Sequence, residues 1–317
     1  MPQILQILEI VLPVFLIVGA GYGGVRIGFF KSVQIDALLF FATRFAIPCL
    51  LFDAMVNLDL GETFEPRFLL SYYASATAAF VLTSLAAWKL FGRRPGESIA
   101  IGFCALFANS ILLGLPVFER AYGADAMGPS FAIIAMHAPY CYALGIIAME
   151  MARADGRAPR DTAAAALKAM FSNALAIGLA LGLAVNLTAT PLPGFFSEAV
   201  SLIGRAGLPI ALFGLGGVLT RYALTSGLAE SATATFASLA VHPALAWWLT
   251  ASVFELPPEF VRAAVVTAAM PPGVNAFLFA QMYDRALDVA AATVLLATLA
   301  AVLSASLWLA ALQAAFP

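Results

Sequence analysis

The sequence has very little charge for its length. Charged residues make up 11% of the 317 positions and hydrophobic residues 62%, whereas a soluble globular domain carries roughly 25% charged residues. This composition excludes a soluble fold, because no soluble core can hide that much apolar surface. The formal net charge is −2, and the basic residues fall in short loops rather than in one patch. Nucleic acid is therefore excluded as a partner.

The sequence is also poor in residues that bind metals or form disulfides. Its three cysteines, Cys49, Cys104 and Cys141, each lie inside an apolar run without CxxC or Cys/His spacing. We interpret them as packing residues and expect no metal or other cofactor. The N-terminus Met1-Pro2-Gln3 lacks a positively charged n-region and a cleavage site, so we expect the first apolar run to remain in the mature protein.

Long apolar runs fill the chain instead, each near the roughly 20 residues that a helix needs to cross a bilayer. They lack the period-2 alternation of a membrane β-barrel and therefore predict helices. The loops are short and leave no room for a soluble catalytic domain. We predict an all-α integral membrane protein whose ten spans lie at about residues 4–25, 33–56, 67–88, 97–121, 127–151, 162–186, 197–219, 228–253, 259–283 and 288–313.

Basic residues are distributed unevenly over alternate loops, and positive residues are retained on the cytoplasmic side. One set of loops carries eleven of them and is predicted to be cytoplasmic; the other carries three. Both termini are then outside, which requires an even number of spans, and the expected location is the bacterial inner membrane. The first set is Arg26, Lys31, Lys89, Arg93, Arg94, Arg153, Arg157, Arg160, Lys168, Arg221 and Arg285; the second is Arg67, Arg120 and Arg262.

The two halves of the chain contain similar segments. Residues 44–52 (RFAIPCLLF) and 205–213 (RAGLPIALF) share Arg, Pro, Leu and Phe at an offset of 161 residues. Each half, 1–156 and 157–317, holds five predicted spans, and an odd number of spans forces the two copies into opposite orientations. This pattern is typical of the inverted repeats of secondary transporters.

Spans four and nine, which correspond in the repeat, are both interrupted. Residues 109–116 (NSILLGLP) break the fourth span, and Met270-Pro271-Pro272-Gly273-Val274-Asn275 breaks the ninth. A double proline removes two backbone donors, which is costly in a membrane unless the region is buried in protein or lines a cavity. Equivalent broken helices predict a transporter binding site. The alternative is an ordinary proline kink in each span.

With these segments the sequence resembles the auxin efflux carrier family of bacterial permeases, which includes malonate transporters and is related to the plant PIN proteins. The resemblance covers nearly the whole chain. It implies a fold like that of bile acid symporters, with a scaffold of spans 1, 2, 6 and 7 and a moving transport domain of spans 3–5 and 8–10. It also implies crossing of the broken spans at the site and homodimers formed through the scaffold. The segments that carry the resemblance are 45–52, 109–116, 206–216 and 271–277, followed by Ala280 and Tyr283.

The motif residues are the first candidates for the substrate site. Asn109 and Asn275 offer amide donors to a carboxylate without the desolvation cost of a charge, and the half-helix N-termini add positive dipole ends. Alternatively, each amide only satisfies the broken backbone of its own helix. The remaining motif candidates are Gly114, Pro116, Pro271 and Pro272.

Three basic or titratable residues are further candidates. His137 and His242 each precede a proline closely and are candidate proton carriers, or they hydrogen-bond a carbonyl freed by that proline. Arg44 lies about 16 Å into the second span. An arginine at that depth is tolerated facing protein or a water-filled cavity, so Arg44 is predicted to face the cavity between scaffold and transport domain and attract the anion, or else to hold the kink at Pro48.

We therefore predict a secondary transporter, and not an enzyme, that moves a small organic anion, with a carboxylate as the expected class, by alternating access in the lipid bilayer. Proton coupling is favoured over sodium coupling. The alternatives are an ion or solute channel, which would need a continuous polar pore, and an intramembrane enzyme, which would need a Ser/His, paired Asp or metal constellation. The sequence provides neither.

Overall fold

The structure is a computed structural model that describes residues 2–58, 65–152, 174–224 and 226–316. Within these ranges the regular structure is helical apart from one isolated β-bridge. Seven of the helices described are long and apolar enough to cross a membrane, so the protein is a multi-pass membrane protein. They are Ile7–Arg26, Ser32–Val56, Pro66–Lys89, Gly128–Ala152, Gly194–Leu219, Leu228–Val253 and Leu287–Ala315, and two shorter apolar helices are Pro95–Leu106 and Ala174–Thr188.

The seven helices lie within a few residues of the corresponding predicted spans. The first part of the predicted sixth span lies outside the described residues, as do four of the basic residues used to predict orientation. The count of ten spans and the orientation of the termini therefore stay predictions. The four basic residues are Arg153, Arg157, Arg160 and Lys168.

The chain divides into two compact units, each assembled from distant segments. Unit 1 contains Met1–Pro13, Phe64–Ala163 and Tyr222–Pro317, and unit 2 contains Val14–Thr63 and Ala164–Arg221.

The first boundary between units falls at Pro13, inside helix α1 (Pro2–Arg26). A proline has no N–H to donate to the carbonyl four residues earlier, which here belongs to Glu9. In unit 1 the guanidinium of Arg120 donates to the carbonyls of Glu9 and Ile10 instead, at 2.8 and 2.9 Å.

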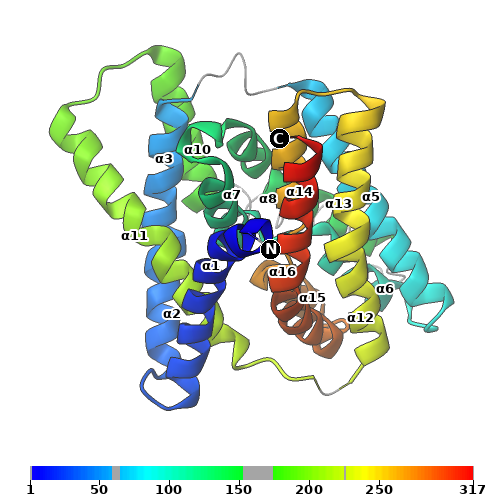
Figure 1. The fold of residues 1–317 in the computed structure, drawn as a ribbon. Coiled ribbons are helices and arrows are strands. Elements are labelled where there is room, and N and C mark those ends of the chain that lie inside the picture. The colour runs from blue at the N-terminus through cyan, green and yellow to red at the C-terminus, as the bar shows by residue number, and fades with distance from the viewer. Residues whose placement is uncertain (1, 59–64, 153–173, 225, 317) are drawn as a thin grey trace. The chain divides into compact units, whose positions relative to one another are not determined.

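In unit 2, α2 (Ser32–Phe41), the π-helix η1 (Ala42–Ala46) and α3 (Ile47–Val56) form one continuous column (Figure 1). Helices α10 (Ala174–Thr188) and α11 (Gly194–Leu219) pack against α3. A Cβ on Gly207 of α11 would lie only 3.1 Å from the backbone nitrogen of Ile47. The two segments that the repeat aligns, around Pro48 and Pro209, are thus in contact.

Glycines allow α1 and α11 to approach closely within unit 2. A Cβ at Gly21 would overlap the carbonyl oxygen of Phe213, and one at Gly216 would overlap the carbonyl oxygen of Val18. A Cβ at Gly19 would instead meet open space. Small residues let membrane helices pack backbone against backbone. Gly21 and Gly216 therefore set the separation of these two helices.

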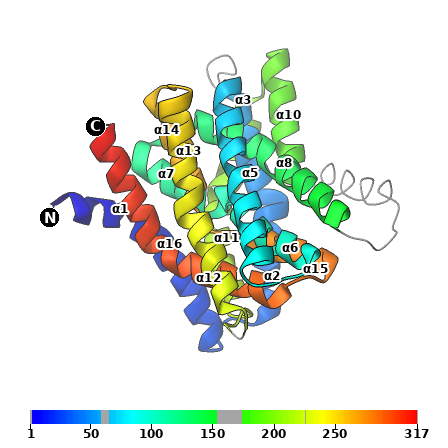
Figure 2. The same ribbon diagram turned by 90° about the vertical axis from the view of Figure 1, so that its right-hand side faces the viewer.

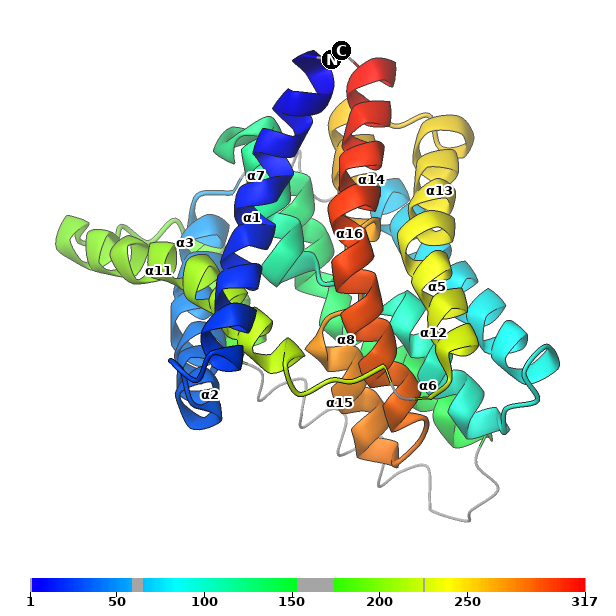
Figure 3. The ribbon, with the colours of Figure 1, turned by 60° about the horizontal axis from the view of Figure 1, so that its bottom comes forward.

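In unit 1, α5 (Pro66–Lys89) runs beside a column made of α12 (Leu228–Phe236), η4 (Ala237–Val241), α13 (His242–Trp247) and η5 (Trp248–Val253) (Figure 2). The long helix α16 (Leu287–Ala315) lies along α12 (Figure 3). Helix α6 (Pro95–Leu106) packs against both α5 and α8 (Gly128–Ala152).

Three of the π-helices end two residues before a proline: η1 before Pro48, η2 (Ser110–Gly114) before Pro116, and η4 before Pro243. A proline ring clashes with the carbonyl four residues earlier, and the wider π turn moves that carbonyl away. The carbonyl freed by Pro243 belongs to Leu239, and it accepts a hydrogen bond from the indole of Trp308 at 2.8 Å. The helix columns thus absorb their prolines without ending.

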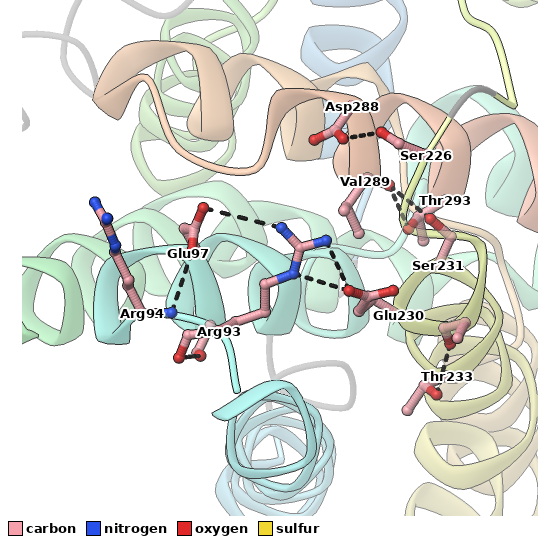
Figure 4. Close-up of polar contacts among 12 residues, drawn as sticks. Arg93, Arg94, Glu97, Ser226, Glu230, Ser231, Thr233, Asp288, Val289 and Thr293 are labelled. Atoms are coloured by element: carbon pink, nitrogen blue, oxygen red, sulfur yellow. Dashed lines mark hydrogen bonds and ion pairs between the residues drawn. The ribbon is translucent and has the colours of Figure 1, made fainter. Parts of the chain in front are cut away.

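One end of unit 1 carries an ion-pair network (Figure 4). Arg93, in the connection between α5 and α6, bonds Glu230 at 2.7 and 2.8 Å and lies 3.9 Å from Glu97. Beside it, Ser226 donates to the carboxylate of Asp288 in the first turn of α16. The network ties the α5–α6 connection to the start of α12, and so links segments from both halves of the chain.

Candidate functional site

The first candidate segment interrupts a helix of unit 1. Helix α6 ends at Leu106, and a new helix begins with η2 at Ser110 and continues as α7 (Leu115–Tyr122). Asn109 caps this second helix: its side-chain oxygen accepts from the backbone N–H of Leu112 at 3.2 Å, and its carbonyl accepts from Gly114 at 3.0 Å. Asn109 therefore does satisfy broken backbone of its own helix, which is one of the two roles considered from the sequence.

The second candidate segment interrupts another helix of the same unit. Helix α14 (Pro258–Ala268) ends before the double proline, and α15 (Val274–Tyr283) begins after Gly273. The backbone N–H of Asn109 donates to the carbonyl of Pro271 at 2.9 Å, and Ala108 forms an antiparallel bridge with Pro272. A Cβ on Gly273 would lie 3.3 Å from the Asn109 side chain. The two breaks thus pair with each other through their main chains.

Asn275 lies in the first turn of α15 and is half-buried. The phenol of Tyr142 in α8 donates to its side-chain oxygen at 3.5 Å, at the limit of a hydrogen bond. Among the residues that the structure describes, neither N–H of the amide has a hydrogen-bond acceptor. The first N–H groups of a helix have no partner within the helix, so the start of α15 adds backbone donors beside this amide.

Aromatic rings stand next to these polar groups. Phe103 and Phe279 stack at 3.8 Å between ring centroids, and Tyr142 lies 5.7 Å from Phe103 and 5.5 Å from Phe107. The paired breaks therefore combine amide and backbone donors, and buried aromatic rings pack beside them. Such donors can bind the carboxylate of an organic anion.

The other motif candidates are buried at the same place, while Arg44 lies in a different unit. Gly114, Pro116, Pro271 and Pro272 are buried around the paired breaks. Arg44 lies in η1 of unit 2 and is exposed, and within the described residues its guanidinium has no hydrogen bond or ion pair. The structure therefore brings together all the motif candidates, whereas Arg44, a separate candidate, belongs to unit 2.

The two histidines are fully buried in unit 1 and have different surroundings. His137 Nε2 lies 3.0 Å from the carbonyl oxygen of Ala108, directly before the first break, so it does not bind the carbonyl freed by Pro139, which belongs to Ala135. His242 does not bind the carbonyl freed by Pro243 either: its ring nitrogens have no partner among the described residues, and Trp308 donates to that carbonyl.

Sequence reasoning missed Tyr142, Ala108 and Tyr72, which lies between the two histidines. An aromatic or alanine inside an apolar run gives no signal of function, because it is equally suited to packing. A functional residue and a packing residue differ only in which neighbouring elements their side of the helix contacts.

Comparison with known proteins places this chain among membrane transporters. A family model described as "Membrane transport protein" matches residues 6–309. The "Putative malonate transporter" of Rhizobium meliloti is 24% identical over 94% of this chain and 93% of its own length. "Uncharacterized transporter YfdV" of Escherichia coli K12 is also 24% identical, over 94% and 95%. "Auxin efflux carrier component 5" of Arabidopsis thaliana is 20% identical over 89% of each chain.

Proposed function

This chain belongs to the membrane transport protein family, which includes auxin efflux carriers, and on that premise we propose that it transports a small organic anion by alternating access. The observation that carries the proposal is the pairing of the two helix breaks in unit 1, through Asn109 and Pro271. Irregular backbone at membrane depth is tolerated where it is buried in protein or lines a cavity, and in transporters it forms the substrate site.

The donor set supports an anion as the substrate class. Asn275 keeps two amide donors, the half-helices beginning at Ser110 and Val274 point positive dipole ends at the breaks, and neither break contains an acidic residue. Two relatives are named for malonate and for auxin, which are both organic acids. Malonate is the first substrate to test.

The division into units supports alternating access. Unit 1 carries both breaks, and unit 2 carries the aligned segments around Pro48 and Pro209. We propose that unit 1 is the transport domain and unit 2 the scaffold, with ten spans arranged as two inverted five-helix repeats. The two breaks contact each other within unit 1, and the segments around Pro48 and Pro209 contact each other within unit 2. These contacts between equivalent segments support such a repeat. Homodimers formed through the scaffold, and the bacterial plasma membrane as the location, complete the proposal.

The asparagines provide the direct test. We expect malonate to raise the melting temperature of the purified protein, because a ligand of the folded state stabilises it. Asn275→Ala should abolish this shift with little effect on expression. Asn109→Ser keeps a capping oxygen but loses the amide donors. It should therefore lower the apparent affinity for malonate about tenfold, which corresponds to about 1.4 kcal/mol, and give a smaller shift.

Asn186 is the matched control for the asparagines. Its amide donates to three carbonyls of unit 2, those of Met55, Val56 and Leu58, at 2.8 to 3.0 Å. Asn186→Ala should lower the melting temperature but leave the malonate shift unchanged. If the shift survives in both Asn275→Ala and Asn109→Ser, the site asparagines are structural.

Arg44 provides a second test, in transport. We propose that its charge attracts the anion, so Arg44→Gln should reduce malonate uptake by about 10–100-fold, as expected for loss of a charge-assisted contact, whereas Arg44→Lys should retain part of it. Arg205→Gln is the control and should take up malonate normally. Arg205 is also exposed, and it contacts Ser201 at 3.3 Å. Normal uptake by Arg44→Gln, or failure of both Arg44 variants through degradation alone, would show that Arg44 has only a structural role.

A further inference from the structure

Three buried side chains of unit 1 form a cluster that the transport site described above does not use. Tyr72 of α5, His137 of α8 and His242 of α13 are each at most 2% exposed. The ring centroid of Tyr72 lies 5.5 Å from that of His242 and 6.0 Å from that of His137. These are the only two histidines in the sequence, and they meet across one tyrosine although they lie 105 residues apart. We call this set the Tyr72 cluster.

Hydrogen bonding distinguishes the two histidines. His137 is held by the Ala108 carbonyl, with the sulfur of Cys141 3.8 Å from its Nδ1. Within the part of the chain that the structure describes, neither ring nitrogen of His242 has a hydrogen-bond partner, and neither does the hydroxyl of Tyr72. A buried polar group without a partner costs about 1–3 kcal/mol, and an intramembrane ionisable residue is retained at such a cost where it has a function.

Given the side chains around it, His242 can carry one proton. The titratable side chains near it are Tyr72 and His137, and the adjoining π-helices η4 and η5 carry none. Tyr73, which lies beside Tyr72 but outside the cluster, donates to the Ile133 carbonyl at 2.7 Å. Among these groups, only histidine ordinarily titrates near neutral pH. The charged residues of the packed helices are Arg67 and Lys89 at the ends of α5, Glu150 near the end of α8, and Glu259 and Arg262 in the first half of α14, where Arg262 donates to the Phe316 carbonyl at 2.7 Å.

The Tyr72 cluster is connected directly to the paired breaks. His137 bonds the Ala108 carbonyl, Ala108 bridges Pro272, and Asn109 follows in the chain. A charge on His137 would act through Ala108 on the backbone that the proposed anion would contact, and a charge on His242 would act on it across Tyr72 and His137 as well. Opposite charges interact strongly in a low-dielectric interior.

We propose that His242 binds the coupling proton and that it does so together with the anion. This inference rests on the proposed function. A lone imidazolium in this buried place is expensive, and an anion at the breaks offsets the cost, so each ligand raises the affinity for the other. The face of the Tyr72 ring adds cation–π stabilisation to the charged imidazole. His137 is a positioning residue that links the cluster to Ala108.

The test is calorimetry of malonate binding to the purified full-length protein, slightly above neutral pH, where free malonate is already fully ionised. Measuring the binding heat in two buffers of different ionisation enthalpy gives the number of protons taken up. We expect about one proton per bound anion in the unaltered protein and none in His242→Gln, which should still bind malonate more weakly. His137→Gln is the matched control and should keep the proton uptake.

A second variant guards against misfolding. His242→Leu removes two buried nitrogens that have no partner among the described residues, so it should melt at the same temperature as the unaltered protein or higher. It should also bind malonate without proton uptake. Unchanged proton uptake in His242→Gln or His242→Leu overturns the proposal, as does loss of uptake in His137→Gln alone. Malonate binding without proton uptake in the unaltered protein overturns the proton site but leaves the anion transporter standing. If neither malonate nor any other organic acid in a binding screen binds, the proposed function fails and the proton site fails with it.

Discussion

The double variant Pro271→Ala, Pro272→Ala is expected to reach the membrane in normal amounts and to transport no malonate above background. Two alanines restore two backbone donors and favour a regular helix from α14 into α15. A continuous helix would withdraw the Pro271 carbonyl from Asn109 and close the half-helix N-terminus at Val274. The measurement is uptake of labelled malonate by cells or proteoliposomes, normalised to the amount of protein in the membrane.

The same segment contains its own control. Pro257 and Pro258 form a second double proline, which lies at the start of α14 rather than at the break. Proline at a helix start removes a donor that has no partner there. The Pro257→Ala, Pro258→Ala variant should therefore transport normally. Wild-type transport by the Pro271/Pro272 variant would show that the break is not part of the substrate site.

The variant Gly21→Ala is expected to lose most of its folded protein. Alanine normally stabilises a helix relative to glycine, so the loss would come from contact alone. The new Cβ would overlap the Phe213 carbonyl oxygen, and α1 and α11 must separate to accommodate it. Overpacking of this kind costs about 1–3 kcal/mol or more. Gly216→Ala should behave alike, since its Cβ would overlap the Val18 carbonyl.

Gly19 and Gly23 are controls on the same helix. Neither has a heavy atom within 4 Å of the position where its Cβ would lie. Gly19→Ala and Gly23→Ala should leave the melting temperature in detergent unchanged or raise it. A fall in melting temperature of equal size in all of the α1 variants would mean that helix flexibility, and not the approach of α11, explains the glycines.

Much of the fold follows from the sequence because lipid imposes a simple rule on it. An apolar run of about 20 residues must be helical, and a proline or polar residue marks its interruption. The family resemblance drawn from the proline and asparagine segments is confirmed by the match over residues 6–309. The seven long helices fall where the apolar runs predict them.

The tertiary contacts were not predictable in the same way. The π-helices before Pro48, Pro116 and Pro243 leave no mark on hydrophobic periodicity, because they add a single residue to one turn. In a uniformly apolar helix no polar face indicates which side meets a neighbour. The bond from His137 to Ala108 depends on that rotation, so the sequence left His137 and His242 equivalent.

The hydrogen bond between Asn109 and Pro271 also has a consequence for biosynthesis. A ribosome reaches Pro271 roughly 160 residues after Asn109, which takes about 8–30 s at ~5–20 residues per second. During that interval the first half of the chain has entered the bilayer while the partner of one of its backbone donors has yet to be synthesised. Pairing of the two breaks is therefore a late event in membrane insertion, and the nascent first half must remain able to rearrange until the second half arrives.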